Sequence, residues 1–221
     1  MPRTTAAVVF AIAALIPAAA SAQASQPGPY VIDVRGVMSG APGDASFYPP
    51  VTTSTRIPRR AFGFGGGAHV YFFRLGVSRL GFGVDAMRTR GTATTVESVT
   101  PTSQTDAAAA VARTVKAKMM VTTLAPQVSF NFGSHDGWSY LSGGYGTTTT
   151  RGAVNIPTSG TDGGSGSRGR QGGAINVGGG ARWFLRERLA FGFDVRFNRL
   201  RAARGLPSKQ IVCVSVGISF R

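Results

Sequence analysis

The chain has 221 residues, 31 of them glycine, and its 24 Lys and Arg against 9 Asp and Glu give a formal net charge of +15. Glycine is about twice as frequent as usual but has no three-residue period, which excludes a collagen-like helix. The 43% of hydrophobic residues exclude wholesale disorder, and with only 15% charged residues the chain cannot cover an ordinary water-facing surface. The length allows one domain or two small ones, and the basic balance points to nucleic acid or an anionic lipid surface.

The first residues have the pattern of an exported protein. Arg3 precedes an apolar run from Ala6 to Ile16, and Ala20-Ser21-Ala22 fits the small-residue rule for signal-peptide cleavage. The run is too short for a helix that crosses a bilayer. We therefore expect residues 1–22 to be a signal peptide and residues 23–221 to be the mature domain, with a buried helix of the fold as the alternative. Export argues against a nucleic-acid partner.

Beyond this segment, apolar and small polar residues alternate in eight stretches bounded by Gly, Ser, Thr, Asn and Pro, a pattern typical of β-strands with one apolar face. The expected strands are, in chain order, Tyr30–Met38, Ala61–Arg74, Leu80–Arg90, Met120–Phe132, Trp138–Arg151, Ala174–Leu185, Leu189–Leu200 and Ile211–Phe220. Most of them are long enough to cross a bilayer at a tilt.

The expected connections alternate in length. Short ones lie near Leu75–Arg79, Gly133–Gly137 and Arg186–Arg188, and longer polar ones near Ser39–Arg60, Thr92–Ala117, Ala153–Gln171 and Ala202–Ser208. A short helix starting at Asp106 is expected in the second long loop. Because the longer connections all follow odd-numbered strands, they gather at one end of an up-and-down sheet. This arrangement predicts an all-β fold, an eight-stranded antiparallel transmembrane β-barrel in a bacterial outer membrane, with both termini in the periplasm.

Three features favour a membrane barrel over a soluble sandwich or lipocalin. The non-apolar strand faces consist mostly of Gly, Ser, Ala and Asn, which suit a narrow lumen. Basic residues gather at the long-loop end. Aromatic residues gather at the short-turn end, as in the girdles of membrane barrels. We expect this girdle to comprise Tyr30, Phe72, Phe73, Phe82, Phe130, Phe132, Trp138, Tyr140, Trp183, Phe184, Phe191, Phe193 and Phe220.

From about Tyr30 to Phe220 the sequence resembles the small outer-membrane β-barrel proteins of the OmpA/OmpX-like, eight-stranded type. The resemblance rests on Gly178-Gly-Gly-Ala-Arg-Trp-Phe-Leu, on Leu189-Ala-Phe-Gly-Phe-Asp-Val-Arg-Phe and on the closing stretch Val212–Phe220. It implies that a terminal strand ending in an aromatic residue is read by the barrel-assembly machinery. Arg221 after Phe220 departs from that pattern. These motifs are patterns of residue type, so they speak for architecture more than for activity.

Seven polar residues are expected to point into the lumen. By strand parity they are Asp33, Arg35, His69, Asp85, Arg182, Asp194 and Arg196. Charges in a poorly solvated interior must pair, so the leading interpretation is a structural salt-bridge network that fills the barrel, with His69 as a packing residue. The alternative is a gated polar pathway for ions or small solutes.

Seven arginines at the long-loop end form a candidate anion-binding rim. They are Arg59, Arg60, Arg88, Arg90, Arg151, Arg199 and Arg201. Because guanidinium groups pair bidentately with phosphate, we hypothesise that this rim binds lipopolysaccharide or another polyanion. The alternative is loop charge that is solvated and has no specific partner.

No catalytic constellation is visible, and two His and one Cys are too few for a metal site, so we expect no enzyme activity, no metal and no cofactor. The leading function is structural or surface-interaction: membrane anchoring and loop-mediated adhesion or recognition. A narrow, porin-like pore for small solutes is the alternative, and a lipid-modifying barrel enzyme is a weaker one. The expected partners are outer-membrane lipids, lipopolysaccharide in particular, and the barrel-assembly machinery, and the expected state is a monomer.

Overall fold

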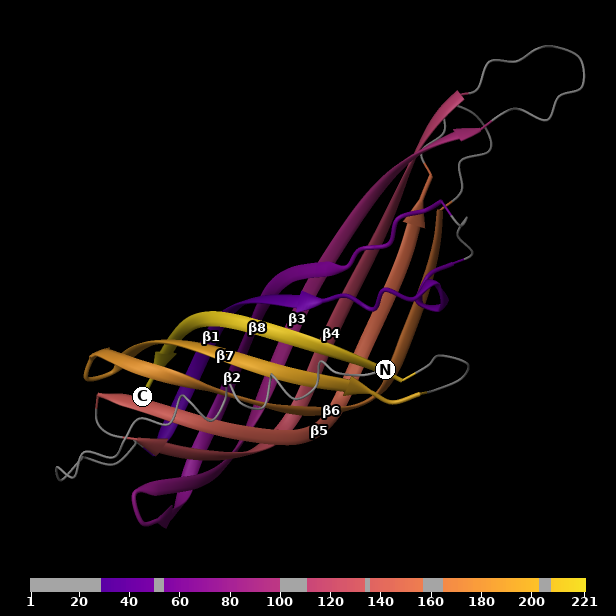
Figure 1. The fold of residues 1–221 in the computed structure, drawn as a ribbon. Coiled ribbons are helices and arrows are strands. Elements are labelled where there is room, and N and C mark those ends of the chain that lie inside the picture. Colours follow the sequence, from indigo (N-terminus) through magenta and orange to yellow (C-terminus); the bar gives the residue numbers. More distant parts are fainter. Residues whose placement is uncertain (1–28, 50–53, 100–110, 134–135, 157–164, 203–207) are drawn as a thin grey trace, which may run out of the picture.

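The computed structural model describes residues 29–49, 54–99, 111–133, 136–156, 165–202 and 208–221. Eight antiparallel strands form a closed barrel in which each strand pairs with its neighbour in sequence and β8 closes onto β1 (Figure 1). The strands are β1 (Tyr30–Gly40), β2 (Arg60–Leu75), β3 (Ser78–Val99), β4 (Val111–Gly133), β5 (Gly137–Asn155), β6 (Ser165–Arg186), β7 (Leu189–Leu200) and β8 (Lys209–Phe220). The predicted all-β, up-and-down barrel is therefore confirmed, and all eight predicted strands are present.

Burial alternates along each strand in the phase that the sequence predicts. In β8, Cys213 and Ser215 are buried in the lumen, while Val212 and Val214 on the opposite face are exposed. The outer surface is therefore apolar: on β2, exposed side chains extend from Phe62 to Phe72. Ten residues cover about 33 Å along a strand, or about 25 Å across the membrane at the usual tilt, which matches the apolar band of outer-membrane barrels.

Most strands are longer than predicted, and four of them are longer by five residues or more. β3 continues to Val99, β4 starts at Val111, β5 continues to Asn155 and β6 starts at Ser165. Most of the predicted loop Thr92–Ala117 and both ends of the predicted loop Ala153–Gln171 are therefore wrong. The β3–β4 ladder continues beyond Gly91–Met119 to Val99–Val111 without a break. The change to polar residues marks the point where the strands leave the membrane, and the sheet continues past it. The predicted helix at Asp106 lies outside the described residues.

The long strands make the barrel asymmetric. Figure 1 shows β3, β4, β5 and β6 extending at one end well beyond the closed part of the barrel, while β1, β7 and β8 are short. The short connections β2–β3, β4–β5 and β6–β7 lie at the opposite end, as predicted. In the β2–β3 turn Gly76 has φ +62°, a left-handed conformation that glycine adopts without steric cost.

The lumen is filled in layers. At the short-turn end Val31, Tyr71 and Trp138 form a small apolar cluster, against which Phe184 packs. Toward the other end a larger apolar cluster contains Val37. On β1, the charged pair Asp33 and Arg35 lies between Val31 and Val37, so the polar layer is enclosed by apolar layers on both sides.

Two residues of the predicted girdle face the lumen. Trp138 and Tyr140 are 1% and 3% exposed and lie on the inner face of β5, so their assignment to the lipid-facing girdle is wrong. The glycine- and threonine-rich pattern of this strand conceals which face is inward. Phe184 is half-buried and edge-on to Trp138, with ring centroids 4.8 Å apart. Phe72 and Trp183 are exposed on the outer face, as a girdle requires.

The described part of the β1–β2 connection packs against the larger apolar cluster, at the end of the lumen opposite the short turns. It contains a short 3₁₀ helix, η1 (Ala45–Phe47), capped by Asp44, which accepts hydrogen bonds from the Ser46 amide (2.9 Å) and hydroxyl (2.7 Å). These bonds hold the pKa of Asp44 below its usual value. Phe47 and the following Tyr48 are buried in the large apolar cluster. Burial raises the pKa of Tyr48.

Strands β3, β5 and β6 hold this segment in place. The Arg168 guanidinium donates to the Ser46 carbonyl at 3.0 Å, and the Ser54 and Thr55 hydroxyls donate to Glu97 at 3.1 and 2.8 Å. A Cβ at Gly152 would overlap the Phe47 carbonyl, so glycine is needed for this close approach. No helix of the described ranges is long and apolar enough to cross a bilayer.

Candidate functional site

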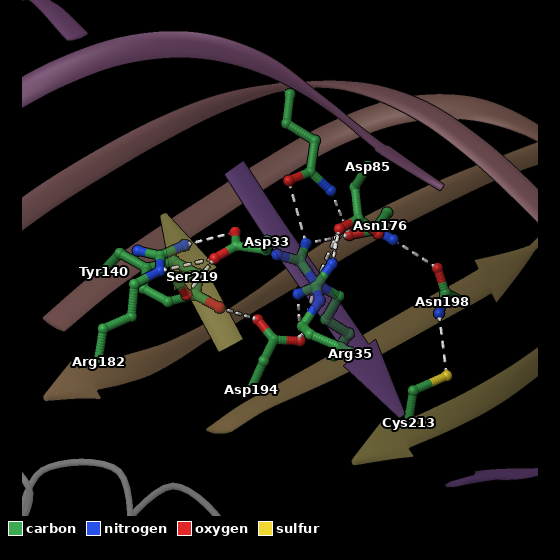
Figure 2. A network of polar contacts seen from close by, with 12 residues as sticks. Asp33, Arg35, Asp85, Tyr140, Asn176, Arg182, Asp194, Asn198, Cys213 and Ser219 are labelled. Atoms are coloured by element: carbon green, nitrogen blue, oxygen red, sulfur yellow. Dashed lines mark hydrogen bonds and ion pairs between the residues drawn. The ribbon is translucent and has the colours of Figure 1, made fainter. Parts of the chain in front are cut away.

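The first part of the lumen network joins β1, β6 and β8. Arg182 donates to both carboxylate oxygens of Asp33, from Nε at 2.9 Å and from Nη2 at 2.7 Å, and the Ser219 hydroxyl donates to Asp33 at 2.6 Å (Figure 2). The Arg182 guanidinium also lies 3.8 Å from the centre of the Tyr140 ring. This bidentate pair is a strong, geometrically specific form of ion pair.

The second part joins two arginines with two aspartates. Arg35 pairs with Asp85, and its Nη1 lies 3.3 Å from Asp194. Arg196 Nε lies 2.8 Å from Asp194 and 3.8 Å from Asp85, so each aspartate contacts both arginines. The Tyr140 hydroxyl donates to Asp194 at 2.6 Å. All these side chains are buried, and three carboxylates against three guanidiniums leave no net charge in this network.

A chain of amides extends the network across the barrel, as Figure 2 shows in part. Arg196 donates to the carbonyl oxygens of Gln127 and Asn176, both at 3.0 Å, and Gln127 donates to Asn176 at 2.8 Å. Asn176 in turn donates to Asn198 at 2.7 Å, and Asn198 to the Cys213 sulfur at 3.3 Å. These residues come from β4, β6, β7 and β8, so the amides tie opposite walls of the barrel together.

Sequence reasoning leaves several members of this network unassigned. Gln127, Asn176, Asn198 and Ser219 all lie on the inward face of predicted strands, but parity alone does not show that they touch one another. Tyr140 is missed because the faces of its strand cannot be read from the sequence. The signal in the sequence that could have indicated this network is the presence of amide side chains at inward positions of three predicted strands.

His69 is buried but stands apart from the ion pairs. It is 1% exposed, and neither ring nitrogen has a hydrogen-bond partner. A Cβ at Gly83 would overlap the His69 ring, which is stacked with Tyr71 at a centroid distance of 6.4 Å. The ring therefore covers a glycine of the next strand. Six of the seven predicted lumen residues form the ion pairs, and His69 packs beside them.

The predicted rim arginines are exposed, but most of them are not in loops. Arg60, Arg88, Arg90, Arg151 and Arg199 lie on strands, because β2, β3, β5 and β7 continue through this level. Arg59 directly precedes β2, and Arg201 directly follows β7. Four of these five lie within strands that the sequence predicts; only Arg60 is expected in a long connection and lies on a strand instead.

The rim residues gather around Met120 on β4. Met120 lies directly opposite Arg90 of β3 on one side and Arg151 of β5 on the other. Arg88 donates to the Met120 sulfur at 3.1 Å, and Lys118, two residues before Met120, is on the same face. Directly opposite side chains in a sheet have their Cβ atoms about 5 Å apart, so Arg90 and Arg151 each lie beside Met120, and the four cations surround this residue. On the β7 side, Arg201 lies 5.4 Å from the centre of the Tyr145 ring.

This cationic ring, defined as the seven rim arginines and Lys118, lies directly above the apolar outer surface. On β3 the outward residues change from Phe82 and Val84 to Arg88 and Arg90, and on β7 the apolar face gives way to Arg199. Of the described carboxylates, none lies on the outward strand faces at this level; they are buried in the lumen, at the short-turn end, or in and against the β1–β2 segment. The ring therefore has no counter-charge from the described part of the chain.

No protein-family model matches the chain, and no curated protein sequence is significantly similar to it. Solved structures are similar in fold. OmpT, the outer membrane protease from Escherichia coli, is 11% identical over 88% of this chain and 97% of its own, with a TM-score of 0.51. Ail, the attachment invasion locus protein of Yersinia pestis, is 12% identical over 86% and 96%, with a TM-score of 0.48. Neisserial surface protein A is 11% identical over 87% and 97%, with a TM-score of 0.46.

At these identities the similarity shows the fold alone. The chain folds as an outer-membrane β-barrel, and the predicted resemblance to the barrels of that membrane is confirmed at the level of architecture. The apolar outer surface agrees with a barrel whose outer face contacts lipid.

The expectation of no enzyme activity, drawn from the absence of a visible catalytic constellation, is wrong. OmpT is a protease with this fold, so catalytic barrels occur within it and the fold excludes no activity. Activity depends on a few side chains that a barrel can carry at many positions. Within the described ranges, no group of three or more His, Cys, Asp or Glu could hold a metal ion.

Proposed function

We propose that the protein is a structural, surface-exposed barrel whose cationic ring binds the phosphate groups of lipopolysaccharide. The observation that carries the proposal is the cluster around Met120, where Arg88, Arg90, Lys118 and Arg151 meet on the outward face with no carboxylate among the described residues nearby. Cations gathered on one face of a sheet repel one another unless an anion lies between them. The ring stands directly above the apolar surface, at the level of lipid head groups.

The strands above the ring supply the surface-interaction part of the proposal. From Arg90 to Val99, β3 continues for nine residues, about 30 Å of chain, and β4, β5 and β6 continue with it. This rigid extension would present the connections at its tip for adhesion or recognition beyond the membrane surface.

Lipopolysaccharide binding is tested on the refolded barrel in detergent. The variant Arg88→Gln/Arg90→Gln/Arg151→Gln should bind purified lipopolysaccharide at least tenfold more weakly than the wild type, because each arginine near an anionic lipid surface contributes about 1 kcal/mol. The matched variant with lysine at the same three positions keeps the charge and should retain most of the binding. Equal affinity of the wild type and the glutamine variant would overturn the proposal.

The layers of the lumen argue against the pore alternative. A solute would have to pass the cluster around Trp138, the paired charges and the larger cluster that holds Phe47 and Tyr48. An eight-stranded barrel is just wide enough for its side chains to fill. We therefore expect no discrete conductance steps from the purified protein in planar bilayers, and stable openings would contradict this.

The proposal also includes export of the chain and its insertion into the membrane. Removal of residues 1–22 would leave residues 23–221 as the mature domain, which the barrel-assembly machinery would insert as a monomer. The outward face of β8, from Val212 to Phe220, supports this route. Arg221, the residue after Phe220, packs against two aromatic rings: its guanidinium lies 4.1 Å from the centre of the Phe184 ring and 5.4 Å from that of Trp138.

A further inference from the structure

Two short turns expose apolar residues at their tips. Leu75 and Val77 in the β2–β3 turn are 55% and 75% exposed, and Leu185 next to the β6–β7 turn is 71% exposed. These residues lie beyond the lipid-facing aromatic residues Phe72 and Trp183 of the same two hairpins. A turn that projected into water would gain nothing from such side chains, so their exposure indicates contact with lipid.

The same turns carry arginines without carboxylate partners. Arg74 and Arg79 are directly opposite each other across the β2–β3 hairpin, an arrangement of like charges that is destabilising by itself. Arg79 is only 9% exposed, and its Nε has no hydrogen-bond partner. Arg186 and Arg188 flank the other turn.

Glu187 is the single carboxylate side chain within these two turns, against four arginines. An amphipathic segment with exposed apolar residues and several cations binds at the interface of a membrane that contains anionic lipid. The β4–β5 connection differs, because its described part carries Asp136 and no exposed large apolar residue.

We propose that the β2–β3 and β6–β7 turns are a second lipid site, which selects anionic phospholipid head groups in the leaflet at the short-turn end. The apolar tips insert among the acyl chains near the head groups, and the exposed Arg74, Arg186 and Arg188 contact the phosphates. This site is separate from the lipopolysaccharide-binding ring and does not depend on it.

Tryptophan fluorescence provides a local measurement of this lipid preference. Trp183 is on the outer face three residues before Arg186, whereas Trp138 is enclosed in the lumen. The full barrel is reconstituted in vesicles of phosphatidylcholine and phosphatidylglycerol, with bromine near the head group of one lipid or the other. At equal mole fractions of brominated lipid, phosphatidylglycerol should quench Trp183 about three- to fivefold more strongly than phosphatidylcholine. A Trp183→Phe variant gives the contribution of Trp138.

The variant Arg186→Gln/Arg188→Gln should reduce the ratio of quenching by phosphatidylglycerol to quenching by phosphatidylcholine to about one. The variant Arg186→Lys/Arg188→Lys should keep most of this preference. Arg88→Gln/Arg90→Gln at the other end should leave the ratio unchanged, which separates this site from the ring.

For the β2–β3 turn, Phe72→Trp in the Trp183→Phe background reports the effect of Arg74→Gln. Equal quenching by the two lipids in the wild type, or an undiminished ratio in the glutamine variant, would overturn the proposal.

Discussion

The arginines of the lumen and those of the outer surface differ in whether the protein itself supplies their counter-charges. Arg35, Arg182 and Arg196 each contact one or two aspartates within 4 Å, and their network as a whole is neutral. Arg90 and Arg151 flank Met120 on the outside with no carboxylate nearby in the described residues. A buried charge has to find its partner within the protein, because desolvation costs several kcal/mol per ion. A charge at a lipid head group finds its partner in the membrane.

The largest effect is expected where the lumen pairing is broken. Asp33→Ala leaves Arg182 buried and uncompensated, which should cost about 3–5 kcal/mol of unfolding free energy. Urea unfolding of the barrel in detergent, followed by the shift between folded and unfolded gel bands, measures this. The double variant Asp33→Ala/Arg182→Met removes both charges and should recover much of the loss. Wild-type stability of the single variant would show that the pair is not needed.

A smaller effect, dependent on the membrane, is expected at the ring. In bilayers that contain lipopolysaccharide, Arg88→Gln/Arg90→Gln/Arg151→Gln should lose about 1–3 kcal/mol of stability, and in neutral detergent close to none. Raising the salt from about 0.1 M to 1 M should shrink this difference, because exposed charges are screened, and should leave the Asp33 effect largely intact. A loss of the same size in neutral detergent would mean that the ring acts within the protein.

The smallest effect is expected at Arg168, whose partner is neutral. Its guanidinium donates to the Ser46 carbonyl and fastens the segment that packs against the larger apolar cluster. Arg168→Gln should cost about 1 kcal/mol, the net value of a single hydrogen bond. Amide hydrogen exchange at Ser46 and Phe47 should accelerate while the barrel strands stay protected. Unchanged exchange at these amides would show that the other contacts of the segment hold it without Arg168.

The sequence predicts the architecture well, because alternation of side chains reports the two environments of a barrel strand. The inward or outward position of Asp33, Arg35, Asp194 and Arg196 follows from the apolar residues on either side of each. Trp138 and Tyr140 are wrongly assigned because Gly- and Thr-rich β5 has no apolar face with which to set the phase. The ends of β3–β6 are missed for a related reason: outside the membrane both faces meet water and the alternation disappears.

By itself the sequence determined the number of strands, their order, the phase of most of them and the separation of basic from aromatic ends. These properties are local, since each depends on residues near one another in the chain. Only the tertiary structure decided which aspartate meets which arginine: Asp33 and Arg182 are 149 residues apart in the chain, and closure of the barrel brings them within 2.9 Å. It also decided that Phe47 and Tyr48 pack in the larger apolar cluster and that Arg88, Arg90 and Arg151 share one surface around Met120. Strand register and closure set these contacts, and both depend on the whole barrel.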